Sequence, residues 1–187
     1  MTRQSHDFLP FENVADLENF CKKYDCSHFL MGSHTKKRPN NLILGRMFNF
    51  QVLDMIEFCV KNYTGIGAHA KNKSKNMNED DNSASTQFSN NIGSKPCLLF
   101  QGDAFVNDEK MKTVQNLFLD CFRGEHDVKK VNLLGLDHGI VVTALDEKTI
   151  HMGHYAIQFE KSGQATPNVV LHNMGPSMVL EMKRTMF

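Results

Sequence analysis

A long polar segment near the middle of the chain places the strongest limit on how this sequence can fold. From Thr64 to Ser94 the residues are mostly Asn, Ser, Lys, Asp and Gly, and the few apolar residues show no periodicity. Such a segment buries too little apolar surface to offset the entropy lost on ordering. We therefore predict a mobile linker or long loop over 65–94, which separates an N-terminal half, 1–64, from a C-terminal half, 95–187.

The overall composition is that of an ordinary globular protein. Of the 187 residues, 41% are hydrophobic and 22% are charged, and 21 basic residues balance 21 acidic ones. A neutral chain has no global field to attract a polyanion, so any contact with nucleic acid must come from a local patch. Five cysteines without CxxC spacing are typical of reduced, buried thiols in the cytosol or nucleus.

In the N-terminal half, apolar spacing predicts a helix over 11–24, strands over 29–31 and 42–44, and a second helix over 52–63. Asn13 is the expected N-cap of the first helix. In the second helix, Glu57 and Lys61 would form an i,i+4 pair on the outer face.

In the C-terminal half, the pattern predicts a strand over 96–100, a helix from about 107 to 123, a hairpin over 139–145 and 149–159, and strands over 168–171 and 178–182 around Gly175 and Pro176. Each half thus contains strands and helices without regular βαβ alternation. This arrangement favours an α+β fold.

A run of cations stands between two apolar stretches. Lys36, Lys37 and Arg38 follow His34 and precede Arg46, and no acidic residue lies among them. Uncharged side chains suited to phosphate oxygens or the ribose 2′-hydroxyl surround the run, namely Ser33, Thr35, Asn40 and Asn41. The pattern fits a phosphate-binding loop and a solvated turn equally well.

Other candidate chemistry is weak. We predict no catalytic residue, no metal site and no cofactor, because the sequence lacks a nucleophile elbow, an HExxH motif, a P-loop and histidines at ligand spacing. Arg123, Lys183 and Arg184 are secondary candidates for RNA contact. Alternatively, Arg123 complements a helix dipole, and Lys183 with Arg184 is the solvated end of a strand.

Eight stretches of the sequence resemble the Brix-domain family, in the same order along nearly the whole chain. They are FLMGSHTKKRPNNL (29–42), GRMF (45–48), VLDMIE (52–57), KPCLLFQGD (95–103), FRGE (122–125), NLLGLD (132–137), KSG (161–163) and GPSM (175–178).

The resemblance implies an α+β Brix fold with two structurally similar lobes of mixed β-sheet and packed helices. It implies a nucleolar, non-enzymatic factor that binds ribosomal RNA during assembly of the large (60S) ribosomal subunit. In the branch that this sequence resembles, the factor works with the regulator of ribosome synthesis protein, and they bring 5S rRNA and its ribosomal proteins to the precursor particle. The resemblance therefore favours the RNA-binding interpretation of the loop over 32–41 and of Arg46.

The sequence departs from the family pattern in three ways. A basic segment and strand that usually precede the first helix, and a Lys/Arg-rich C-terminal tail, are not found, and the insert over 71–91 is longer. The neutral net charge, together with the tails that we expect from the family and do not find, favours an alternative function, a protein-interaction scaffold in the same pathway whose partner supplies the RNA contacts. An enzyme acting on RNA would need convergent acids or a His/Lys pair near the basic loop, and the sequence shows no such cluster.

Overall fold

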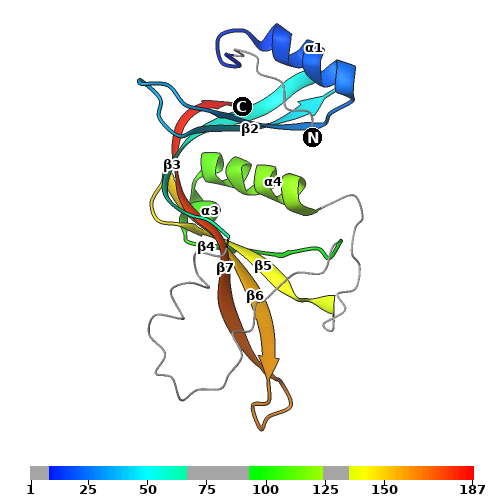
Figure 1. The fold of residues 1–187 in the computed structure, drawn as a ribbon, viewed down its shortest axis with the longest axis vertical. Coiled ribbons are helices and arrows are strands. Elements are labelled where there is room, and N and C mark those ends of the chain that lie inside the picture. The colour runs from blue at the N-terminus through cyan, green and yellow to red at the C-terminus, as the bar shows by residue number, and fades with distance from the viewer. Residues whose placement is uncertain (1–8, 67–92, 124–134) are drawn as a thin grey trace. The chain divides into compact units, whose positions relative to one another are not determined.

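The computed structural model describes residues 9–66, 93–123 and 135–187 (Figure 1). Most of the predicted linker, at 67–92, lies outside the described residues. The elements are α1 (Val14–Tyr24), β1 (His28–Ser33), β2 (Asn41–Phe48), β3 (Gln51–Thr64), β4 (Cys97–Gln101), α3 (Ala104–Asn107), α4 (Glu109–Arg123), β5 (His138–Ala144), β6 (Thr149–Glu160) and β7 (Asn168–Met186).

The strands form a mixed sheet in the order β1-β2-β3-β7-β6-β5-β4. The chain divides into two compact units, one of Met1–Cys59 with Met182–Phe187 and one of Val60–Glu181. These units do not end where the predicted halves end, because β3 and β7 each contribute residues to both. The predicted α+β class is confirmed.

In the first unit, helix α1 lies against the antiparallel strands β1, β2 and β3 (Figure 1). The predicted cap is present, since Asn13 Oδ1 accepts a hydrogen bond from the backbone N–H of Ala15 at 3.2 Å. Leu17 and Cys21 are buried against Met47 of β2. Burial is also the main reason that the pKa of the Cys21 thiol is raised.

The predicted helix over 52–63 is wrong, because these residues form β3. In β3 the five consecutive residues 54–58 are all buried. A strand that is buried on both faces shows no alternation, and its apolar spacing can then match a helix. The expected Glu57–Lys61 pair is also wrong, because Lys61 Nζ lies 2.5 Å from Glu181 Oε2.

In the second unit, β4 and β5 are parallel and are joined through α3 and α4, as a parallel pair requires. The buried residues of α4 recur at helical spacing, as in an amphipathic helix: Met111, Val114, Leu117 and Phe118. The predicted hairpin is present as the antiparallel pair β5 and β6. At its turn, a hydrogen bond from the backbone N–H of Lys148 is the main reason that the pKa of Asp146 is lowered.

The two strands expected on either side of Gly175 and Pro176 are a single strand, β7. Its ladder with β6 is irregular here, because the pairing passes from Gly153–Ser177 to Tyr155–Asn173. A proline that lacks an N–H is tolerated at such an irregularity, where no ladder bond is required. The dipeptide therefore interrupts the register and not the strand.

Glycine is required at position 45 by close packing. A Cβ atom there would lie 2.4 Å from Phe29 Cζ and 2.8 Å from the Asp54 carbonyl oxygen. We expect Gly45→Ala to lower the free energy of unfolding by about 2 kcal/mol, measured by urea denaturation. Gly32→Ala is the matched control, because a Cβ atom at position 32 would have no atom within 4 Å, and it should change stability by less than about 0.5 kcal/mol. Equal stability of the two variants would contradict the packing argument.

Candidate nucleic-acid interface

The predicted basic stretch forms the connection between β1 and β2. Ser33 ends β1 and Asn41 begins β2, and the two residues are paired in the antiparallel ladder. Between them, Thr35 and Arg38 close a turn in which each backbone N–H donates to the other residue's carbonyl oxygen, at 3.0 and 3.1 Å. The Arg38 N–H also donates to Thr35 Oγ1 at 3.1 Å. The connection therefore has its own hydrogen-bonded frame.

The remaining polar side chains extend this frame. The backbone N–H of Asn40 donates to His34 Nδ1 at 3.1 Å, and Asn40 has a left-handed φ of 48°. Asn41 Nδ2 donates to Ser33 Oγ at 3.2 Å. Direct contact of these residues with RNA stays a prediction. In the protein alone, the hydrogen bonds of these residues stabilise the conformation of the loop.

Glu57 connects the loop to two other parts of the first unit. Its side chain is only 2% exposed, and both carboxylate oxygens accept from Arg38 Nη1, at 2.7 and 3.0 Å. The same carboxylate accepts from Arg184 Nε at 2.5 Å and from Nη2 at 3.1 Å. The Arg184 guanidinium also lies over the ring of Phe11, 4.4 Å from its centroid. A buried carboxylate is thereby fully paired, as burial of a charge requires.

This cluster joins two of the predicted RNA contacts, Arg38 from the loop and Arg184 from the end of β7. Two guanidinium groups share one carboxylate, so the cluster keeps a net charge of one positive unit. The arginine side chains are 43% and 35% exposed, so both remain accessible to an anion.

Arg46 is placed differently from the loop cations. It stands directly opposite Asp54 in the β2–β3 ladder, and its Nε donates to Asp54 Oδ1 at 3.0 Å. The Arg46 and Asp54 side chains are only 17% and 7% exposed. Its contact with RNA stays a prediction, but the structure gives Arg46 a clear role in the sheet.

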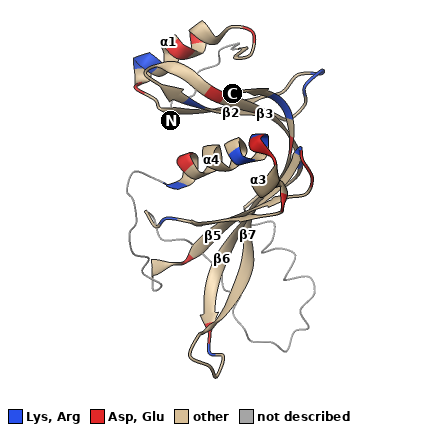
Figure 2. Ribbon diagram, turned by 180° about the vertical axis from the view of Figure 1, so that it is seen from behind, with Lys and Arg blue, Asp and Glu red and all other residues tan. Residues whose placement is uncertain are grey.

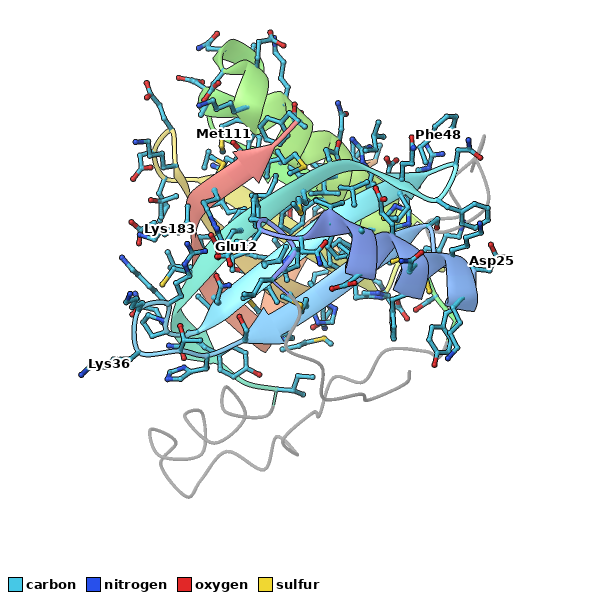
Figure 3. The ribbon with its side chains drawn as sticks, turned by 90° about the horizontal axis from the view of Figure 1, so that it is seen from above. Glu12, Asp25, Lys36, Phe48, Met111 and Lys183 are labelled. Carbon is cyan, nitrogen blue, oxygen red and sulfur yellow. The ribbon has the colours of Figure 1, made fainter. Side chains whose placement is uncertain are left out.

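Lys36 and Lys37 form the tip of the loop, and both are exposed. Figure 2 shows the cationic colour at this tip, and Figure 3 shows Lys36 pointing away from the strands. Among the ion pairs of the described residues, none involves either lysine. These two ammonium groups are therefore exposed charges of the loop that no carboxylate of the described residues pairs.

The other secondary candidates are Lys183 and Arg123. Lys183 is exposed and precedes Arg184 in β7, so strand alternation directs the two side chains to opposite faces. Arg123 ends α4 in the second unit. Contact of Lys183 or Arg123 with RNA stays a prediction.

Sequence reasoning missed Glu57, which it assigned to the solvent face of a helix. A strand interpretation of 51–64 would have placed Glu57 on the same face as Met55, which is buried. Two acids in such a run, Asp54 and Glu57, near a cluster of cations, were the available signal.

One Ser, His and Asp grouping exists in the second unit but lacks the geometry of a nucleophile triad. Asp137 Oδ1 lies 2.5 Å from His138 Nδ1, and Ser94 Oγ lies 3.4 Å from the same nitrogen. A triad needs the acid and the nucleophile on opposite ring nitrogens. The grouping therefore gives no support to nucleophilic catalysis.

The described residues support neither metal ligation nor a membrane-spanning helix. No group of three or more His, Cys, Asp or Glu residues in that part of the chain could hold a metal ion. No described helix combines the length and apolar character needed to cross a membrane.

This is an α+β protein with zero formal net charge. Its cationic loop is held by hydrogen bonds and by an ion pair with Glu57. The chain belongs to the Brix domain family, whose sequence model matches residues 1–184. This match confirms the family resemblance found in the sequence motifs.

The relatives are similar over nearly the whole chain. Proteins named "Ribosome production factor 2 homolog" are 40% identical over 176 residues in Mus musculus and 37% identical over 185 residues in Arabidopsis thaliana. These alignments cover 94% and 98% of this chain but 52% and 54% of the relatives, so the chain spans about half of their length.

A solved structure also shows some likeness to this chain. It is titled "Crystal structure of probable ribosomal biogenesis protein from Aeropyrum pernix K1" and is 9% identical, with a TM-score of 0.44, covering 90% of this chain and 75% of that one. Likeness at this level carries no argument about function.

The two kinds of cation should respond differently to substitution. Arg46→Ala leaves the carboxylate of Asp54 buried without its guanidinium partner, so we expect the free energy of unfolding to fall by about 3 kcal/mol. Lys36→Ala removes an exposed charge and should change it by less than about 0.5 kcal/mol. Urea denaturation of both variants measures the difference, and similar values would show that the Arg46–Asp54 pair does not stabilise the sheet.

Proposed function

We propose that this chain acts in ribosome biogenesis as a non-enzymatic factor that binds ribosomal RNA during assembly of the large subunit. Membership of the Brix domain family and similarity to ribosome production factor 2 homologues support the pathway. The observation that carries RNA binding is the exposure of Lys36 and Lys37 on a hydrogen-bonded loop.

The charge of the loop suits a polyanion. Lys36, Lys37, Arg38 and Arg184 carry four positive charges against the single negative charge of Glu57. The two lysines would neutralise phosphates and release their counterions, which makes affinity fall steeply with salt. Because the loop is already shaped by its own hydrogen bonds, less entropy is lost when its side chains meet RNA.

The proposed partners follow from the family resemblance. They are 5S rRNA, neighbouring large-subunit rRNA, the 5S-associated ribosomal proteins and the regulator of ribosome synthesis protein. In this proposal the factor resides in the nucleolus and helps to recruit the 5S ribonucleoprotein to the precursor particle. Its contribution is positioning, and it breaks no covalent bond.

A second candidate is a protein-interaction scaffold whose partner supplies the RNA contacts. The turn between β2 and β3 favours it, because Phe48 and Phe50 are 73% and 42% exposed. Neighbouring exposed aromatic side chains are typical of protein contact surfaces. Absence of 5S rRNA binding by the isolated chain would favour the scaffold over direct RNA binding.

The double variant Lys36→Ala/Lys37→Ala tests direct binding. We expect it to bind 5S rRNA transcribed in vitro roughly tenfold more weakly than the parent near physiological salt. The slope of log K against log salt should fall by about 1.5, because two fewer phosphates are neutralised. Fluorescence anisotropy over a salt titration measures both quantities.

Lys22→Ala/Lys23→Ala is the matched control. These lysines form an exposed pair in the last turn of α1, in the same unit, so the change in net charge is identical. This control should keep the parental slope. Equal affinity and slope in the loop variant and the parent would rule out the loop as an RNA contact.

A further inference from the structure

Glu57 stands in an unexpected place for an RNA-binding surface. It is an acid on strand β3, bonded to a loop that is proposed to meet phosphate. If attraction between charges alone governed affinity, removing this carboxylate would leave the surface one unit more positive and would tighten binding. The geometry of its contacts suggests the opposite effect.

Besides the hydrogen bonds within the loop and the Ser33–Asn41 pair at its base, Arg38 connects the loop to the neighbouring strand β3 through this acid. Arg38 lies next to Lys37 and donates two hydrogen bonds to Glu57. Glu57 is itself fixed in the ladder between β2 and β3. A second link, from Cys59 Sγ to the Pro39 carbonyl oxygen, is a weak sulfur contact of 3.7 Å. Loss of the Glu57 carboxylate would therefore release the side of the loop that carries the lysines.

Arg184 fixes the direction of the Glu57 carboxylate. It donates through two nitrogens, Nε and Nη2, and its guanidinium is stacked on the ring of Phe11. Such a fork holds a carboxylate in one plane more firmly than a point charge could. The orientation of Arg38 thus depends on a residue of β7.

We infer that Glu57 is a positioning residue for RNA binding. It preorganises the Lys36–Lys37 tip by holding Arg38 on a carboxylate of β3 that Arg184 of β7 keeps in a fixed orientation. This inference rests on the proposed function of the loop. Glu57 itself does not contact the RNA. It acts by reducing the number of conformations of the free loop, so the loop loses less conformational entropy when it binds RNA.

Glu57→Gln is the main test, because glutamine keeps the shape and removes the charge. We expect binding of 5S rRNA to weaken about tenfold despite the more positive surface. The slope against log salt should stay parental, since the lysines still neutralise the same phosphates once bound. Without RNA, hydrogen exchange at the Arg38 and Asn40 amides should become faster, while the exchange of the α4 amides stays unchanged.

Two further variants complete the design. Glu57→Asp keeps the charge but is one methylene shorter, so it should weaken binding by an intermediate factor of about three. This variant also keeps the test informative if Glu57→Gln folds poorly. Glu147→Gln removes an equal charge from the exposed β5–β6 turn and should bind like the parent.

The outcomes separate the two proposals. If the lysine double variant binds weakly while Glu57→Gln binds as tightly as the parent or more tightly, the positioning inference is overturned and RNA binding by the loop stands. A change in slope with Glu57→Gln, or unchanged exchange of the loop amides, also overturns it. If the lysine double variant matches the parent, the proposed RNA contact fails and this inference fails with it.

Discussion

The carboxylate of Glu57 lies almost completely buried in β3, where an unpaired charge would be strongly destabilising. Arg38 and Arg184 supply four hydrogen bonds from segments that are distant in the chain. The need to satisfy one buried acid therefore ties the β1–β2 loop, the middle of β3 and the end of β7 together. The ion cluster thereby connects the loop that carries Lys36 and Lys37 to the sheet.

The same requirement divides the cations of this neutral chain into two groups. Arg46 and Arg38 are held by carboxylates of β3, whereas Lys36 and Lys37 stand exposed at the loop tip. A cationic run in a sequence thus contains side chains with different roles. Arginine suits the paired positions because of its planar fork, whereas an exposed lysine presents a compact point charge on a flexible stem.

Sequence periodicity worked where an element has one buried face and local signals at its ends. Helix α1 begins after the predicted cap Asn13, and β5 and β6 form the predicted hairpin. Sequence periodicity gave a wrong prediction for β3, which is buried on both faces. It was also wrong for β7, which continues through Gly175 and Pro176, where the ladder with β6 is irregular. In both failures the pairing with neighbouring strands decided the outcome, and no local propensity reports such pairing.

The loop sequence and the family motifs were sufficient to identify an α+β Brix domain and to select the basic stretch as its candidate binding site. The partners of its charges could not be derived in this way. Whether Arg38 meets solvent or Glu57, and whether Arg184 lies near either, depends on contacts between residues far apart in the chain. Residue types and their spacing carry local conformational preference, but the pairing of buried charges is settled only when the strands pack side by side.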